Sequence, residues 1–421
     1  MKSQDVKIIS AVPGTGKSSW AFSHIRSNGG RRWLYVSPYL DEVGDGNRTG
    51  RIQKECPQHG FKSPVSKSRK NKTEHLQELL ENNENIACTH ALFNRMTTEH
   101  CKWLKCHNYS IIIDEVLEGI SLLSATEDTK QDVIALLSEE FLVQHKDGRL
   151  EWNPDKPILR VYSDIVEHCE RGELYLYKDD VLIRRGNSKA IASAQECYVM
   201  TYLFESSVMS KWLRVNNIGY EYVDVPLYRP PAEVKESMRK LIKVADVPKN
   251  IQKIEQKQKN PLYTFSATSY KKRLTDEDFA VMKRTIESSV RKHRYDAHLT
   301  SKASVLWTTF LDYQELIEGV GYTKNSGASS EDAATPFASK NMRASNEYAD
   351  KNIVFYTANI FAHPTLTSYI EHLGMDFDED EYALSECIQF IYRSAIRKGE
   401  PIIVVFFSTR MKELFEEWLH L

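Results

Sequence analysis

Short apolar runs and amphipathic stretches alternate along the first part of the chain. Four runs rich in β-branched and aromatic residues predict strands, at residues 6–12, 33–37, 85–90 and 109–116. Helical periodicity fills the intervals between them, at residues 17–27, 73–81 and 91–104. Apolar strands that alternate with helices indicate a parallel sheet covered by helices on both faces, in which ligands bind at the carboxyl ends of the strands.

The first domain continues after an interruption. A strand at 198–203, a helix that ends near residue 213 and a strand at 220–225 extend the same repeat. The segment from about 120 to 195 does not fit it, and we interpret this segment as an accessory insertion. Within it, residues 174–185 predict a β-hairpin that turns at 178–180.

A second α/β domain is predicted in the C-terminal half. Its strands are expected at 303–310, 352–356 and 401–407. Thr275 is a natural N-cap for a helix that runs to residue 291, and Asp312 is expected to cap another. The proline-containing stretch 226–231 and the Lys/Gln-rich stretch 249–259 are typical of a linker, about 226–260. We therefore place the two domains at 1–230 and 231–421.

Composition excludes a mostly disordered chain. The chain is 41% hydrophobic and 27% charged, values typical of globular proteins. Its length of 421 residues indicates two or three domains. No stretch approaches 18 apolar residues, no signal peptide is recognisable, and the seven cysteines lack a disulfide spacing. These features predict a cytoplasmic protein with reduced thiols and no membrane partner.

Charge is balanced over the chain but not along it. The net charge is only −2, which gives no indication of a nucleic-acid partner. Between residues 47 and 73, however, eight Lys and Arg residues face Glu55 alone, a local excess of seven positive charges. Two interpretations remain open for this stretch: a loop that follows phosphates, and a flexible solvated loop.

A phosphate-binding loop follows the first predicted strand. Residues 11–18 read Ala-Val-Pro-Gly-Thr-Gly-Lys-Ser, which matches the loop motif except that alanine replaces its first glycine. Backbone N–H groups of such a loop surround phosphates, the lysine reaches the β- and γ-phosphates, and the serine hydroxyl binds Mg²⁺. The expected nucleotide-binding residues are Gly14, Thr15, Gly16, Lys17, Ser18 and Ser19.

An Asp-Glu pair ends the fourth predicted strand. Three isoleucines lead into Asp114 and Glu115, which should emerge at the carboxyl edge of the sheet, beside the phosphate loop. We expect Asp114 to hold Mg²⁺ through water and Glu115 to orient and deprotonate the attacking water. Together, the loop and the pair predict a nucleoside triphosphatase with ATP and Mg²⁺ as cofactors.

A third pattern lies near the C-terminus. Gln389, Arg393 and Arg397 recur every four residues, so on one helix they would share a face. Two arginines in line suggest fingers that reach a γ-phosphate, and the alternative is a solvated basic helix face.

In this order, the three motifs resemble those of superfamily 2 helicases, and the chain is most similar to DEAD-like helicases encoded by bacteriophages. Residues 200–205, 342–348, 383–397 and 408–419 carry the closer likeness. The resemblance implies two RecA-like P-loop domains with ATP between them and a nucleic-acid strand across their tops. In that setting, a protruding hairpin at 174–185 would act as a wedge at the duplex fork; the alternative is an ordinary exposed ribbon.

The resemblance also implies roles residue by residue. Asp114 and Glu115 correspond to the Walker B box, and Gln389, Arg393 and Arg397 to motif VI, although the gap between the arginines is three residues rather than two. Nucleic-acid contacts fall on Thr89, His90, Arg343 and Asn346. Thr201 takes the coupling role of motif III; the triplet Ser266-Ala-Thr268, far beyond Asp114, is interpreted as a coincidental match. Only ten residues precede the loop, which leaves no room for an upstream adenine-reading motif.

We therefore predict a monomeric ATP-driven helicase or translocase that unwinds DNA with a single-stranded region, in phage replication or recombination and beside the proteins of those processes. The alternative is a terminase-like DNA packaging ATPase with a metal-dependent nuclease domain. Its carboxylates would come from Asp376, Asp378, Glu379 and Asp380, although four acids within five residues are more typical of a solvated turn.

Overall fold

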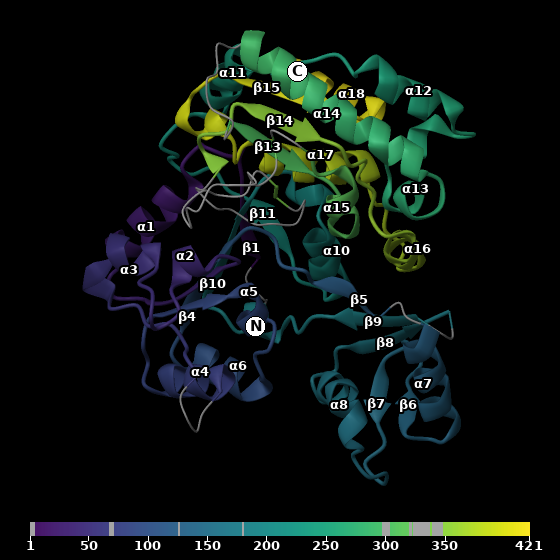
Figure 1. Cartoon of the computed structure of the whole chain (residues 1–421). Helices are drawn as coiled ribbons and strands as arrows, with labels where there is room; N and C mark the ends of the chain where they lie inside the picture. The colour runs from purple at the N-terminus through teal and green to yellow at the C-terminus, as the bar shows by residue number, and fades with distance from the viewer. Residues whose placement is uncertain are drawn as a thin grey trace. The chain divides into compact units, whose positions relative to one another are not determined.

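The computed structural model describes residues 5–66, 71–124, 127–178, 181–296, 304–319, 322, 337–338 and 348–421 (Figure 1). By their contacts, the residues form two compact units. The first comprises 1–11, 16–228 and 363–377, and the second comprises 12–15, 229–362 and 378–421. The main change of unit, between Tyr228 and Arg229, falls within the predicted linker.

A six-stranded sheet forms the centre of the first unit. Its strand order is β11-β1-β10-β4-β2-β3, and every neighbouring pair is parallel. The strands are β1 Val6–Ser10, β2 Arg32–Ser37, β3 Ile86–Thr89, β4 Tyr109–Asp114, β10 Glu196–Thr201 and β11 Tyr220–Tyr222. The predicted parallel sheet is therefore confirmed.

Apolar side chains cover both faces of this sheet. Successive residues of a strand point to opposite faces, and Ile111 and Ile113 join one buried cluster while Ile112 joins the other. The helices of this sheet are α1 Lys17–Ser27, α2 Leu40–Val43, α3 Arg51–Glu55, α4 Lys72–Glu81, α5 His90–Phe93, α6 Thr98–Cys106, α9 Lys189–Ala192 and α10 Val208–Val215. The single helix expected at 91–104 is wrong, because Thr97 forms a capping box with His100 and starts a new helix there.

The accessory segment has its own small core. It contains β5 Ile120–Ser124, α7 Glu127–Ser138, β6 Leu142–Gln144, β7 Leu150–Trp152, α8 Ser163–Glu170, β8 Leu174–Tyr177 and β9 Val181–Arg185 (Figure 1). Strands β5, β9 and β8 form one antiparallel sheet, and β6 pairs with β7.

The hairpin β8–β9 forms as predicted, but its strands do not protrude. Strand β9 lies between β5 and β8, and Ile183 is fully buried. The hydroxyl of Tyr177, at the end of β8, donates to the carbonyl oxygen of Ser368 at 3.0 Å, in α16 Pro364–His372 of the same unit. This packing contradicts an exposed ribbon for these strands. The wedge stays a prediction, because Asp179 and Asp180 of the turn lie outside the described residues.

The second unit contains a four-stranded parallel sheet of order β12-β15-β14-β13. The strands are β12 Ile242–Val244, β13 Val305–Thr308, β14 Ile353–Tyr356 and β15 Ile402–Phe406. The helices are α11 Pro231–Leu241, α12 Lys249–Lys257, α13 Ala267–Lys272, α14 Asp276–Asp296, α15 Gln314–Ile317, α17 Glu379–Ile391 and α18 Thr409–His420.

Local predictions in this unit have mixed outcomes. Thr275 caps α14 as expected, because its hydroxyl accepts the Asp278 N–H at 3.3 Å. Asp312 does not begin an α-helix and lies in a 3₁₀ turn. The stretch 249–259 is not a linker, since Ile251 and Ile254 of α12 are buried. Overall, the chain is an α/β protein with parallel sheets flanked by helices.

Candidate functional site

Two glycines with a left-handed backbone lie in the loop between β1 and α1. Gly14 and Gly16 have φ of +91° and +92°, a region that strongly favours glycine. Gly16 is the N-cap of α1, and the Thr15 hydroxyl donates to the carbonyl oxygen of Val12 at 3.0 Å. Ala11 is not among the described non-glycine residues with positive φ, so alanine is tolerated where the motif has its first glycine.

Lys17 is buried at the start of α1, with 9% of its surface exposed. Its Nζ donates to the carbonyl oxygen of Ala11 at 2.5 Å. Burial lowers the pKa of Lys17, while the charges of Glu115 and Asp114 oppose this effect. Ser18 is half-buried and Ser19 is exposed in the same turn. The predicted lysine and both carboxylates therefore lie within electrostatic reach of one another.

Asp114 ends β4 in a buried polar environment. Its Oδ2 accepts long hydrogen bonds from the hydroxyls of Tyr35 and Ser37, each at 3.4 Å. Burial and the negative charges of Glu115 and Glu42 raise its pKa to about 8, although Lys17 and the Tyr35 bond act in the opposite direction. A cation beside this carboxylate would relieve the repulsion that raises its pKa.

Glu115 follows with a left-handed backbone, at φ +65°. This conformation is uncommon for a residue with a side chain, and such residues concentrate at functional sites. Its N–H donates to the carbonyl oxygen of Met200 at 2.9 Å, and its Oε2 accepts the Thr201 hydroxyl at 3.4 Å. The neighbouring strand β10 thus holds both the backbone and the carboxylate of Glu115.

Thr201 connects the two halves of the site. Strand β10 lies between β1 and β4, and Thr201 pairs with Ser10 while Met200 pairs with Asp114. The Thr201 carbonyl oxygen accepts the Ala11 N–H at 2.9 Å, so one residue contacts both the phosphate loop and Glu115. Ser266, from the rival triplet, instead caps α13 in the second unit.

Thr89 and His90 lie at the carboxyl end of β3, where α5 begins. Thr89 is the N-cap of α5, where its hydroxyl accepts the Leu92 N–H. His90 is 6% exposed, and its Nε2 lies 2.9 Å from the carbonyl oxygen of Asp114. Burial leaves little of the His90 side chain for contact with a strand, and the nucleic-acid contact of Thr89 stays a prediction. Arg343 and Asn346 lie outside the described residues.

Three residues near Asp114 were missed by sequence reasoning. Tyr35 and Ser37 lie in the second half of β2, the strand paired with β4, and Glu42 in α2 follows the same strand. Arg51 lies 3.4 Å from the Glu42 carboxylate. The sequence contained one signal for them: the parallel strands β2 and β4 have their carboxyl ends at the same edge of the sheet, so residues near the end of β2 should lie near Asp114.

The C-terminal pattern does not form one helical face. Helix α17 ends at Ile391, and the Ser394 hydroxyl donates to the Ile391 carbonyl oxygen at 2.7 Å. Ser394 is extended, and a 3₁₀ helix, Ala395–Lys398, follows it. The expectation of a continuous stripe is therefore wrong, because Ser394 satisfies the helix end.

The three residues of that pattern have different environments in the second unit. Gln389 donates to the Ser385 hydroxyl at 3.4 Å. Arg393 is 7% exposed, with its guanidinium 5.9 Å from the Phe390 ring centroid. Arg397 is exposed. The solvated-face alternative is therefore also wrong for Arg393.

Tyr392 identifies a further cation that the pattern did not suggest. Burial raises the pKa of Tyr392, and the charges of Arg397 and Arg229 both lower it. The two guanidinium groups therefore lie near the same phenol within the second unit. Arg229 is half-buried and lies between Pro226 and Pro230, where the chain passes from the first unit into the second.

Three of the acidic residues at 376–380 lie at the N-terminus of α17: Asp378, Glu379 and Asp380. Asp378 caps α17 by accepting the Glu381 N–H at 2.8 Å. Asp380 pairs with Arg410 at 2.6 Å. These contacts are those of a helix N-terminus with acidic residues in its first turn.

Much of the basic stretch at 47–73 is structured rather than a free loop. It includes α3 and a 3₁₀ turn, and several of its cations are paired. Arg48 pairs with Asp41, and Lys62 pairs with Glu84 at 2.7 Å. Lys67, Arg69 and Lys70 lie outside the described residues.

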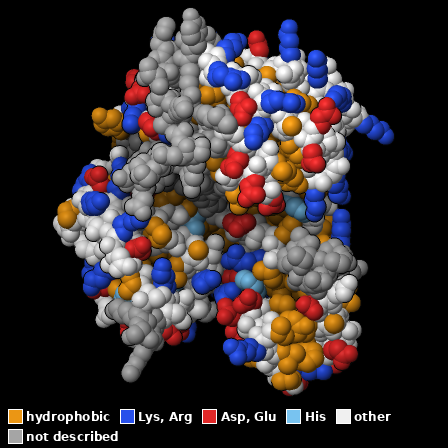
Figure 2. All heavy atoms as spheres, in the orientation of Figure 1, with side chains coloured by type: hydrophobic (Ala, Val, Ile, Leu, Met, Phe, Trp, Pro, Cys, Tyr) orange, Lys and Arg blue, Asp and Glu red, His pale blue; other side chains and the backbone are white. Residues whose placement is uncertain are grey.

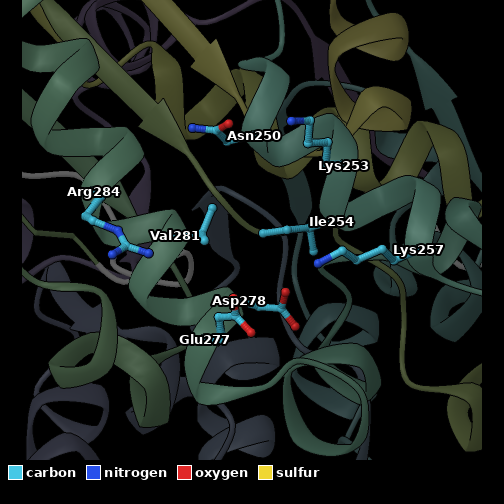
Figure 3. A pocket seen from close by; sticks show the side chains of 8 residues that line it. All are labelled: Asn250, Lys253, Ile254, Lys257, Glu277, Asp278, Val281 and Arg284. Atoms are coloured by element: carbon cyan, nitrogen blue, oxygen red, sulfur yellow. The ribbon is translucent and has the colours of Figure 1, made fainter.

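The second unit has a cavity of about 330 Å³ between α12 and α14. Figure 3 shows Lys253 and Lys257 of α12, and Glu277, Asp278 and Arg284 of α14, around it. On the face seen in Figure 2, Lys and Arg side chains are interspersed with Asp and Glu over the helices of this unit. The cavity therefore has no uniform charge that would select a ligand.

The site and sheets define an α/β protein with a phosphate-loop motif and two adjoining carboxylates. Residues 236–419 match the family model described as the YonV C-terminal Rossmann-like domain. Over 430 aligned positions, the chain is 27% identical to the SPbeta prophage-derived uncharacterized protein YonV of Bacillus subtilis (strain 168), with 98% of each chain covered. Among the described residues, no helix is long and apolar enough to cross a membrane.

Proposed function

We propose that the chain is a Mg²⁺-dependent nucleoside triphosphatase whose hydrolysis drives movement along nucleic acid, as in a helicase or translocase. One observation carries the nucleotide part. Lys17, Asp114 and Glu115 converge at the carboxyl ends of β1 and β4, with Thr201 between them. This combination matches what phosphoryl transfer to water requires.

The residues present fit a magnesium nucleotide. Gly14 and Gly16 give the loop its left-handed backbone at the N-terminus of α1, and the Tyr392 hydroxyl and the Tyr228 Cβ lie where their Cβ atoms would be. Ser18 and Asp114 would hold the metal, which when bound supplies charge neutralisation at the phosphates. Lys17 would exchange the Ala11 carbonyl oxygen for a phosphate oxygen, and Glu115 would accept the proton of the attacking water.

The movement part rests on the resemblance to phage helicases. Thr201 is the candidate coupling residue, because it contacts both the loop and Glu115. Arg397, exposed and near Arg229, is a stronger candidate finger than the buried Arg393. The similarity to a prophage-derived protein is consistent with a phage setting for replication or recombination. The helix-capping contacts of the acidic residues at 376–380 give the terminase alternative no support.

Single-stranded nucleic acid is expected to increase the rate of ATP hydrolysis severalfold, since an ATP-driven motor is coupled to its track. Phosphate release by the wild type would be measured with Mg²⁺ alone, with single-stranded DNA and with single-stranded RNA. Strand displacement on 3′- and 5′-tailed duplexes would then determine polarity. Rates that neither nucleic acid changes would exclude the motor and retain the triphosphatase, whereas metal-dependent nicking of DNA would favour the terminase alternative.

A further inference from the structure

The segment that follows β11 presents an exposed aromatic side chain beside the phosphate loop. After Tyr222, inward and outward side chains alternate: Val223, Val225 and Leu227 pack against the buried cluster of the first unit. Tyr228 faces outward and is 84% exposed, the largest exposure among the described large hydrophobic residues that are exposed. Alternation in an extended segment therefore accounts for the outward direction of its ring.

One backbone hydrogen bond and one close approach place this tyrosine beside the loop. A Cβ built on Gly16 would lie 2.7 Å from the Tyr228 Cβ and 3.4 Å from its backbone nitrogen. The next residue, Arg229, donates its N–H to the carbonyl oxygen of Thr15 at 3.0 Å. Strand β11 is the parallel neighbour of β1, so the two chain segments leave the sheet at the same edge. The position of Tyr228 next to Gly16 is therefore set by the fold.

We propose that Tyr228 is the platform on which the nucleobase of the bound nucleoside triphosphate stacks. This inference rests on the proposed nucleotide site, because it places the base of that nucleotide next to Tyr228, beside the phosphate loop. An exposed aromatic ring offers a flat apolar face, and bases stack on such rings with little dependence on their identity. A site of this kind takes nucleoside triphosphates as a class and prefers them to tripolyphosphate.

In this arrangement, the residue that stacks on the base comes from a segment far from the phosphate loop in the sequence. The segment after β11 returns to the loop from about two hundred residues away and places Tyr228 directly beside Gly16. Stacking on one face leaves the hydrogen-bonding edges of the base unread, which predicts weak discrimination between ATP and GTP.

The test compares a ligand with a base and a ligand without one. Full-length wild type and the variants Tyr228→Ala, Tyr228→Phe and Tyr222→Ala would be titrated calorimetrically with the magnesium complex of a nonhydrolysable β,γ-imido ATP analogue and with magnesium tripolyphosphate. Tyr228→Ala is expected to lower the affinity for the nucleotide analogue by about 5- to 30-fold and to leave the affinity for tripolyphosphate unchanged. Tyr228→Phe keeps the ring, and Tyr222→Ala removes another outward tyrosine, 55% exposed on β11; both should bind like the wild type.

Three results would overturn the inference. Unchanged binding of the analogue by Tyr228→Ala would show that the ring does not contact the base. An equal loss of affinity for both ligands would show that the substitution disturbs the phosphate loop instead. Failure of the wild type to bind either ligand would overturn the proposed nucleotide site and this inference with it, so the two failures are distinguishable.

Discussion

Replacing Glu115 with glutamine is expected to lower kcat for ATP hydrolysis by about 10²- to 10⁴-fold, the usual contribution of a general base. Glutamine keeps the shape of the side chain and its bond from the Thr201 hydroxyl, but it cannot accept a proton from water. Binding of the magnesium nucleotide should change little, because the loop and Lys17 remain intact. The measurements are steady-state phosphate release and calorimetric binding of the same nonhydrolysable analogue.

Glu118→Gln is the matched control for this substitution. Glu118 lies three residues further on and is exposed, so removing its charge should leave kcat unchanged. If Glu115→Gln hydrolysed ATP at the wild-type rate, Glu115 would not be the base. Parallel loss of binding and kcat would instead assign Glu115 to nucleotide affinity.

Asp114→Asn should abolish Mg²⁺-dependent hydrolysis and at the same time stabilise the unliganded protein. The wild-type carboxylate is buried near Glu115 and Glu42, so its ionised form is costly without a cation. Asparagine removes that charge at similar volume. At about pH 8, in EDTA, we expect the free energy of unfolding to rise by about 2 kcal/mol or more.

The sign of the pH dependence follows from the direction of the shift. The pKa of Asp114 is about 8 in the folded chain, above its ordinary value of 3.8. Between these values the folded state binds the proton more tightly, so wild-type stability is highest below the unfolded pKa and falls as pH rises towards 8. The slope from this group is about 1.4 kcal/mol per pH unit.

Urea unfolding at about pH 5 and about pH 8 separates the variants on this basis. The advantage of Asp114→Asn over the wild type should be larger at the higher pH. Asp224→Asn, an exposed aspartate of the same unit, is the control and should show no such trend. A stability difference that is constant with pH, or a destabilised Asp114→Asn at both values, would contradict the assignment of the repulsion to Asp114.

The strands and the phosphate loop were predictable because their signals are local. Apolar runs such as 109–114 predict buried parallel strands when helices alternate with them. The loop motif lies in eight consecutive residues. The contacts of Asp114 were not predictable in this way. Tyr35 and Ser37 are nearly eighty residues away in the chain and reach Asp114 only through the order of the strands.

The wrong predictions have two physical causes. Hydroxyl side chains bind backbone groups and so end helices, and buried apolar residues form a helix within a polar stretch. Thr97 divides the helix expected at 91–104, and Ser394 ends the one expected to carry Arg397. In α12, two buried isoleucines within a Lys/Gln-rich stretch were sufficient for an amphipathic helix. Their spacing of three residues is typical of a helix, but the Lys/Gln-rich composition indicated a linker instead.

Phosphate release by the wild type and Lys17→Ala, each with Mg²⁺ and ATP, tests the central claim most directly. Lys17 is the buried cation shared by the loop and the two carboxylates, and loss of such a group costs about 10²- to 10³-fold or more in kcat. Lys243→Ala, an exposed lysine of β12, is the control for the loss of a surface charge. We predict Mg²⁺-dependent release by the wild type and Lys243→Ala, with a residual rate at least about 100-fold lower for Lys17→Ala. Equal rates for the wild type and Lys17→Ala, or no release by the wild type with any nucleoside triphosphate, would contradict the account.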